Sequence, residues 1–411
     1  METEKLYYID SHLMAFSAHV LRCESLPDGR CYAVLDRTAF FPEGGGQLAD
    51  TGMIGAVRVL DVQEENGEIR HYLSAPIAAE QAEVPCTIDR EQRLRRMQNH
   101  SGEHVFSGLV HSTFGYDNVG FHMGESCMTI DFSGEITWEE LLALEKRANE
   151  IVCENIPIRT FFPGPEELPA LSYRAKLDLT ENVRIVEIEG VDRCACCAPH
   201  VCFTGEIGMI KVLSCERHRG GCRIELVCGM DALDHFNERQ RSVTEISNLL
   251  SAKRTEVSPA VEHLMAERDE LKFVLVATER RLLEALAEAV PDEEENLLFI
   301  NDQAISLSEN AEMPKAAPGT GILKKEASQR ELVNLLVPRC RGMAAVFTGS
   351  DDGGYRYVIG SRNCDLRAKA REINTALSGR GGGRPEMIMG SCTAPAAKIR
   401  EYFASGSSMF L

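Results

Sequence analysis

The chain has 411 residues, 44% of them hydrophobic, and a formal net charge of −19 at pH 7. A chain of this length is too long to fold around one ordinary hydrophobic core, which predicts two to four domains. No apolar run approaches the roughly 18 residues that a bilayer requires, which excludes a membrane-spanning helix. The negative charge excludes nucleic-acid binding by the average surface, so such a partner would need local basic patches.

Residues 1–90 predict a small β-barrel. Short apolar segments such as Cys31–Leu35 and residues 57–62 alternate with turn residues. A glycine-rich motif, Gly44-Gly45-Gly46-Gln47, interrupts them. Three glycines allow positive φ angles and a close approach of the backbone to a ligand. On the glycines alone, a flexible hairpin is the other interpretation.

Residues 91–235 predict an α+β domain. A helix begins near Glu91 and continues through Leu109, and a second covers residues 138–155 with Thr137 as its N-cap. Strands are expected at residues 183–188, 209–213 and 223–227.

Residues 236–292 predict a helical connector. Between Val257 and Ala289, mostly apolar residues recur in alternating steps of four and three, which indicates a short coiled-coil seam. This seam can form a homodimer or pack back within the chain, and we favour the homodimer.

Residues 293–411 predict an α/β domain, with strands at 297–300, 344–347 and 355–359 and helices at 331–337, 366–377 and 394–403. A glycine run, residues 379–385, separates two of the helices. Its backbone N–H groups could hold a phosphate, or it could be a mobile loop. The overall fold class is therefore α+β with several domains.

A set of histidines and cysteines predicts a zinc site. His100 and His104 are four residues apart on one helix face. The segment 194–200 adds Cys196 and His200, which have the spacing Cys-x3-His, although by spacing Cys194 and Cys197 rival Cys196. Three imidazoles with one thiolate suit tetrahedral zinc.

Three further expectations concern residues near this site and the cell compartment. Glu103 directly precedes the second histidine, so we expect it to point away from the shared face and to be a poor general base. Without a basic and apolar leader, the protein is expected in the cytoplasm. Its fifteen cysteines would there be reduced or bind metal.

Five arginines are candidates for nucleic-acid binding because they lie in local basic patches. Arg93 and Arg96 precede the histidine pair, and Arg223 follows the cysteine segment. Arg380 and Arg384 flank the glycine run. Each patch alone is also typical of a solvated surface.

Several motifs together resemble the alanyl-tRNA editing proteins of the AlaX type and the editing part of alanyl-tRNA synthetase. The motifs are Phe-Pro-Glu-Gly-Gly-Gly-Gln-Leu-Ala-Asp-Thr-Gly at residues 41–52, Met-Gln-Asn-His-Ser-Gly-Glu-His at 97–104, and residues 196–208. The glycine run at 379–385 resembles a loop of the C-terminal domain shared with DHH-type phosphoesterases. The resemblance covers nearly the whole chain and implies the long form, with barrel, editing core, connector and C-terminal domain.

The resemblance implies one zinc ion bound by His100, His104, Cys196 and His200, which selects Cys196 over its neighbours. It also implies that residues 44–47 line the substrate pocket. This chain departs from the family at Ala198-Pro199, where relatives usually have Gly-Thr, so a threonine hydroxyl is missing. It also has Cys222 before Arg223, where relatives often have two arginines.

The activity implied is hydrolysis of the ester in mischarged tRNA(Ala), chiefly Ser-tRNA(Ala) and secondarily Gly-tRNA(Ala). A pocket made for alanine rejects other small amino acids poorly, which makes a second hydrolytic site useful. Four protein ligands normally close a zinc shell, so we favour zinc as an element that shapes the pocket over zinc that activates water. No catalytic residue is assigned. The alternatives are a zinc-stabilised tRNA-binding module without activity and, less favoured, a phosphoesterase.

Overall fold

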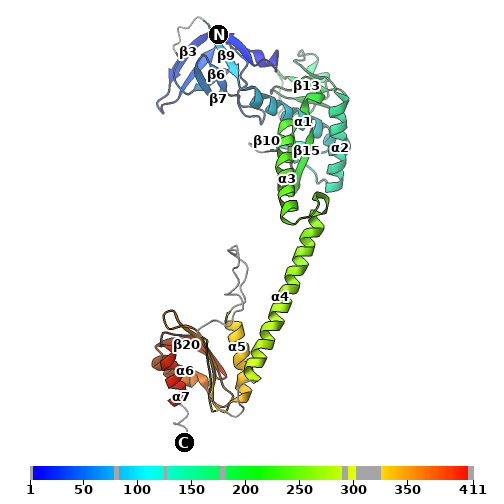
Figure 1. The fold of residues 1–411 in the computed structure, drawn as a ribbon. Helices are drawn as coiled ribbons and strands as arrows, with labels where there is room; N and C mark the ends of the chain where they lie inside the picture. Colours follow the sequence, from blue (N-terminus) through cyan, green and yellow to red (C-terminus); the bar gives the residue numbers. More distant parts are fainter. Residues whose placement is uncertain are drawn as a thin grey trace. The chain divides into compact units, whose positions relative to one another are not determined.

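The computed structural model describes residues 3–77, 83–124, 127–175, 182–288, 295–301 and 325–405. It is a mixed α+β, multidomain structure that divides into two compact units, Met1–Leu249 and Leu250–Leu411 (Figure 1). Within the described ranges, no helix is both long and apolar enough to cross a membrane. The finer domain boundaries at residues 90, 235 and 292 stay predictions.

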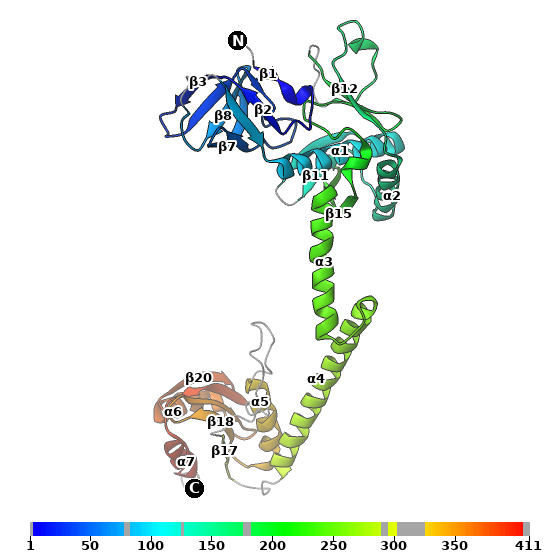
Figure 2. The same ribbon diagram turned by 45° about the horizontal axis from the view of Figure 1, so that its top comes forward.

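The N-terminal part of the first unit is a rolled antiparallel sheet, drawn in blue in Figure 2. In spatial order its strands are β2 (Ala15–Ala18), β9 (Val84–Ile88), β6 (Gly52–Ile54), β7 (Val57–Glu65), β8 (Glu68–Leu73), β4 (Cys31–Leu35) and β3 (Val20–Ser25). Only His19 separates β2 from β3, so one bent stretch of chain pairs with β9 at one end of the row and with β4 at the other. The prediction of a β-structure in this part is thus confirmed, and the sheet forms a half-barrel.

Short elements complete this part. The parallel pair β1 (Glu4–Lys5) and β5 (Arg37–Thr38) lies beside the 3-10 helix η1 (Leu6–Tyr8). Fully buried side chains such as Leu35, Phe40 and Ile54 fill the inside of the roll.

The rest of the first unit packs two helices on sheets. The helices are α1 (Arg90–Phe114) and α2 (Trp138–Glu154). The larger sheet has the order β10 (Asn118–Met123), β11 (Met128–Phe132), β16 (Gly221–Cys228), β15 (Ile210–His218), and the smaller has the order β12 (Ile158–Phe161), β13 (Ile185–Ile188), β14 (Asp192–Ala195). Two 3-10 helices, η2 (Leu168–Ala170) and η3 (Thr204–Ile207), and α3 (Gly229–Leu249) complete the unit.

The local signals that predicted these helices are present in the structure. The Thr137 side chain accepts a hydrogen bond from the backbone of Glu140, whose side chain returns one, so α2 begins with a capping box. Helix α1 ends at Gly115, which has a positive φ angle of 70°. The strands expected near residues 183, 209 and 223 correspond to β13, β15 and β16, whereas β10, β11, β12 and β14 were not predicted.

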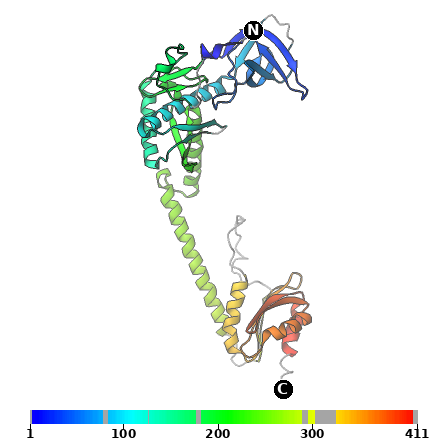
Figure 3. The same cartoon turned by 180° about the vertical axis from the view of Figure 1, so that it is seen from behind.

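The second unit is a five-stranded sheet between two layers of helices. Its strands in order are β17 (Leu297–Asn301), β18 (Ala344–Ser350), β19 (Gly354–Gly360), β21 (Met387–Cys392) and β20 (Gly379–Arg384), with only the first pair parallel. Its helices are α4 (Val257–Glu288), α5 (Lys325–Leu336), α6 (Leu366–Ala376), α7 (Ala396–Ser405) and the 3-10 helices η4 (Arg254–Glu256) and η5 (Val337–Arg339). The end of α4 and α5 cover one sheet face, and α6 and α7 cover the other (Figure 3).

The glycine run, for which a phosphate-binding segment and a mobile loop were both open, forms the edge strand β20. It pairs with β21 from Gly379↔Cys392 to Arg384↔Met387. A Cβ atom on Gly381 or Gly383 would lie within 2.4 Å of a carbonyl oxygen of β21. The glycines therefore serve close strand packing, and the mobile-loop interpretation is wrong.

The connector is helical as expected, and its apolar residues are largely exposed. Leu264, Leu271 and Phe273 on α4 are 51%, 68% and 75% exposed. The last seam position, Ala289, lies outside the described residues. Exposure of this kind leaves dimerisation a prediction.

Candidate metal centre

Helix α1 brings two imidazoles together in the interior of the first unit. His100 and His104 are each 2% exposed, and their ring centroids are 5.5 Å apart. The helix can lie this deep because Ser101 and Gly102, which follow His100, are small. A Cβ on Gly102 would lie 2.3 Å from the Cys228 sulfur, so only glycine lets α1 approach β16 so closely.

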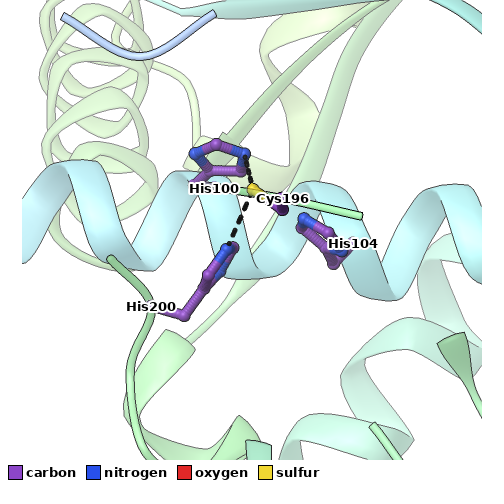
Figure 4. Close-up of side chains that lie close together, drawn as sticks. All are labelled: His100, His104, Cys196 and His200. Atoms are coloured by element: carbon purple, nitrogen blue, oxygen red, sulfur yellow. Dashed lines mark hydrogen bonds between the residues drawn. The ribbon is translucent and has the colours of Figure 1, made fainter. Parts of the chain in front are cut away.

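The other two candidate ligands come from the loop after β14. The Cys196 Sγ atom lies 3.5 Å from His100 Nε2 and 3.4 Å from His200 Nε2 (Figure 4). One donor atom from each of the four residues lies within 4.8 Å of the other three. Ligands bound to tetrahedral zinc at about 2.3 Å (sulfur) and 2.05 Å (nitrogen) are about 3.5 Å apart. The donor set and its spacing therefore fit zinc.

Each histidine is held by a second residue at its other ring nitrogen. Nδ1 of His104 donates to Asp192 at 2.9 Å, and Nδ1 of His100 donates to Gln47 at 2.9 Å. Nδ1 of His200 donates to the Ser101 hydroxyl at 3.1 Å. All three Nε2 atoms are thereby left for the centre. Such outer partners orient metal ligands and set their tautomer.

Asp192 also joins the centre to Arg174. The guanidinium donates to the carboxylate through Nε at 2.7 Å and through an NH2 group at 2.8 Å. Burial opposes ionisation of Asp192, but the bonds from His104 and Arg174 outweigh it and hold the pKa of this carboxyl below its ordinary value. Nothing in the local sequence pattern singles out Asp192, Ser101 or Arg174, because their partners are distant in the chain.

Electrostatics favours Cys196 over its two neighbours as the thiolate. Burial raises the pKa of Cys196, but His100 and His200 overcome this and bring it well below its ordinary value. Burial raises the pKa of Cys194 and of Cys197 to about 11. A thiolate is the form that binds metal. This result agrees with the ligand set that the family resemblance implies.

The glycine motif forms a tight turn against the centre. Gly44 and Gln47 exchange two backbone hydrogen bonds of 3.0 Å, and Gly45 and Gly46 have φ angles of 61° and 83°, as in a two-residue hairpin turn. A Cβ on Gly46 would lie 2.6 Å from the Phe121 ring. The predicted positive φ angles are present, and the segment packs closely instead of forming a loose hairpin.

The side-chain NH2 group of Gln47 is an unused donor group. Its side chain is fully buried, its Oε1 atom accepts from His100, and its Nε2 atom has no hydrogen-bond partner among the described residues. A buried amide N–H without a partner is costly. Its presence beside the candidate ligands marks a place where a bound molecule could accept a hydrogen bond.

Glu103 differs from its prediction. It is 5% exposed, its Oε1 atom accepts from Ser107 and Asn118, and its Oε2 atom lies 3.9 Å from His104 Nε2. The expectation that it points away from the centre is wrong, because packing of β10 on α1 turns the carboxylate inward.

The arginines near the centre are mostly internal. Arg93 is fully buried, where it pairs with Asp50 and donates to the carbonyl oxygens of Ala39 and Ser11. Its role is to hold the barrel against α1, which corrects the expectation that it contacts tRNA. Arg96 donates to the carbonyl of Ala49 and is also largely covered.

The remaining tRNA-binding candidates are accessible. Arg223 pairs with Asp131 at 2.7 and 2.8 Å, with 35% of its side chain exposed. Arg380 and Arg384 are both exposed and lie on the edge strand β20. A groove of about 650 Å³ lies between this strand and α6, and Arg367 and Arg371 line it.

Known proteins are similar to this chain over most of its length. Residues 183–225 match the family model described as the threonyl and alanyl tRNA synthetase second additional domain. The alanyl-tRNA editing protein AlaX-L of Pyrococcus horikoshii is 28% identical over 96% of both chains. The chain is a relative of the AlaX-type alanyl-tRNA editing proteins.

It is also related to alanyl-tRNA synthetases. The alanine–tRNA ligase of Methanopyrus kandleri is 31% identical over 96% of this chain. The chain spans 43% of that ligase and 32% of the one from Ignicoccus hospitalis. Among solved structures, the C-Ala domain of Aquifex aeolicus alanyl-tRNA synthetase covers 28% of this chain at 19% identity with a TM-score of 0.18.

Proposed function

We propose that the chain hydrolyses the aminoacyl ester of mischarged tRNA(Ala), chiefly Ser-tRNA(Ala) and also Gly-tRNA(Ala), at the centre formed by His100, His104, Cys196 and His200. The observation that carries the proposal is the joint placement of this three-nitrogen, one-sulfur donor set and the glycine turn with the unused Gln47 amide. The similarity to AlaX-L over nearly the full length supports it.

The ligand set would hold one Zn²⁺ ion, and because four protein ligands fill its shell, the ion would shape the pocket and orient the ester instead of activating water. The chain's own residues position the substrate. The Gln47 Nε2–H group donates to a substrate oxygen, and its Oε1 atom keeps His100 in place. An aminoacyl ester is already activated, so fixed orientation supplies much of the rate.

The small pocket wall and the missing threonine bear on specificity. Gly45 and Gly46 offer no side chains, and both Ala198 and Pro199 are buried. Arg184 donates to the carbonyl oxygens of Cys196 and Ala198 at 3.1 and 2.7 Å, which stiffens the loop without a threonine hydroxyl. Recognition of the serine hydroxyl therefore falls to Gln47 and to backbone groups.

The proposal assigns tRNA backbone contacts to the accessible arginines. Arg380 and Arg384 on β20 and the arginines of the α6 groove present cations beside an edge strand whose glycines leave the backbone open. Each phosphate contact contributes to affinity and to its salt dependence. Arg223 is a further contact at the first unit.

The proposal further includes a homodimer through α4 or the C-terminal domain and a cytoplasmic location, where charged tRNA is used. Exposed Leu271 and Phe273 on α4 supply the apolar surface for such a dimer. Light scattering of the full chain and of Leu271→Glu tests this, since the dimer predicts a halved mass for the variant.

The decisive experiment is deacylation of Ser-tRNA(Ala), Gly-tRNA(Ala) and Ala-tRNA(Ala) by the full chain. We expect rapid release of serine, little release of alanine, and loss of activity in Cys196→Ala and after chelation. Cys153→Ala is the matched control, because Cys153 is an exposed cysteine on α2. Hydrolysis that survives Cys196→Ala and zinc removal would refute the proposal, and tRNA binding without ester cleavage would show a binding module instead.

A further inference from the structure

A second group of metal-binding side chains lies in the first unit, apart from the four ligands described above. His12 precedes β2, Cys202 follows the last ligand of the main centre by two residues, and Glu206 belongs to η3. One donor atom from each lies within 4.8 Å of the other two. A histidine, a cysteine and a carboxylate from segments almost 200 residues apart thus converge.

The distances within this group repeat the pattern of the main centre. The Cys202 Sγ atom lies 3.6 Å from His12 Nδ1, close to the roughly 3.5 Å that separates sulfur and nitrogen ligands of one zinc ion. The other ring nitrogen, Nε2, lies 2.8 Å from the Glu206 carboxylate. Glu206 therefore holds His12 in the way that Asp192 holds His104. Each carboxylate lies at the ring nitrogen that does not face the cysteine sulfur.

Both sides of the group are anchored to α1. Gln98 donates through Nε2 to the Glu206 carbonyl at 3.0 Å, and the backbone N–H of Phe203 donates to the Glu206 carboxylate at 3.1 Å. On the other side, Arg93 donates to the Ser11 carbonyl at 3.0 Å, and the His12 backbone N–H donates to Asp10 at 2.8 Å. These bonds hold the donor atoms in position without a metal.

The group is also open to solvent and negatively charged. The His12 and Glu206 side chains are 33% and 35% exposed, and Cys202 is exposed. Asp10 adds a second carboxylate to its neighbourhood. An ion in solution can reach these donors directly, whereas the main centre is buried.

We propose that His12 and Cys202, with Glu206 behind the imidazole, bind a second divalent transition-metal ion, with Zn²⁺ as the natural occupant. A thiolate beside an imidazole selects zinc and its neighbours in the transition series over magnesium or calcium. Two direct protein ligands leave the remaining positions to water. This site therefore binds metal more weakly than the main centre, and it exchanges metal faster.

A metal bound here links two segments that are far apart in the sequence. The segment before β2 would be joined through the ion to the loop that carries His200. A ligand that binds only the folded state stabilises it. Added metal should therefore raise the melting temperature even when the main centre has been removed.

The test uses the full chain, stripped with a chelator and titrated with Co²⁺, whose absorption reports thiolate ligands. We expect two equivalents for the wild type, the second weaker than the first. Cys202→Ser and His12→Gln should each bind one equivalent, Cys196→Ala should keep the weaker one, and Glu206→Gln should weaken it about 10- to 100-fold. Cys153→Ser, which changes an exposed cysteine on α2, should still bind two.

Two results would overturn the inference. One is a titration in which the wild type and Cys153→Ser both stop at a single equivalent of Co²⁺ when the metal is in excess. The other is a Cys202→Ser titration that matches that control. Retention of the tight equivalent in Cys202→Ser and His12→Gln shows that these variants are folded, so a loss of the weaker one is specific. These readouts do not depend on hydrolytic activity and stand apart from the proposed function.

Discussion

Replacing Asp192 with asparagine tests whether the carboxylate behind His104 supports the metal centre. In the structure this side chain is 2% exposed and accepts three hydrogen bonds, one from His104 at 2.9 Å and two from Arg174 at 2.7 and 2.8 Å. An asparagine keeps the shape but has one acceptor oxygen and an NH2 group that faces a donor. In one orientation the amide removes the acceptor of His104 and of one Arg174 N–H group, and in the other it removes the acceptor of the Arg174 Nε–H group.

The expected effect follows from the role of such partners in other metal sites. Removing an outer carboxylate typically lowers metal affinity 10- to 100-fold, or about 1.4–2.7 kcal/mol. We place Asp192→Asn toward the larger value, because the change also leaves the guanidinium of Arg174, whose side chain is 15% exposed, without its charged partner.

The assay is competition for Zn²⁺ between the protein and a coloured chelator at pH 7.5. The matched control is Asp131→Asn, because Asp131 makes the same two-bond pair with Arg223 at 2.7 and 2.8 Å but holds no candidate ligand. Asp192→Asn should lose affinity and Asp131→Asn should not. Equal affinity of Asp192→Asn and the wild type, with both variants folded, would refute the argument that this carboxylate sets the tautomer of His104.

Three further outcomes follow from the first unit. Gly102→Ala places a Cβ 2.3 Å from the Cys228 sulfur and should cost about 1–3 kcal/mol of unfolding free energy. In urea titrations the double variant Gly102→Ala/Cys228→Ala should lose less unfolding free energy than the sum of the two single variants, and additive losses would contradict the clash. Arg93→Met removes the hydrogen-bonded cation of the buried Asp50 and leaves only Arg96, at 3.9 Å. The change should cost about 3–5 kcal/mol of unfolding free energy, with partial recovery in Arg93→Met/Asp50→Leu by the same measurement. Burial lowers the pKa of His71 to about 4, below its ordinary 6.5. The stability that its neutral ring contributes is therefore complete above pH 6.5, and about 3 kcal/mol of it is lost as the pH falls from 6.5 toward 4. When unfolding is measured at a series of pH values, His71→Gln should lose less stability in acid than the wild type, and equal losses would count against a buried neutral ring.

Features that depend on residues near one another in the chain could be predicted from the sequence. The pairing of His100 with His104 follows from helix geometry alone, and the capping box at Thr137 follows from three-residue spacing. The turn at Gly45-Gly46 follows from the freedom of glycine to take positive φ angles. Residue types alone also restricted the metal to one that accepts nitrogen and sulfur.

Features that depend on partners far apart in the chain were decided only by tertiary packing. Cys196 lies 96 residues from His100, and Gln47 and Asp192 lie 53 and 88 residues from the histidines that they hold. The glycine run at Gly379 became a strand because β21 lies beside it. Arg93 looks like a surface cation in sequence, yet the barrel closes over it, because a buried Asp50 and two carbonyl oxygens satisfy its charge and its donors. Burial and long-range contact are properties of the folded chain, and no local pattern carries them.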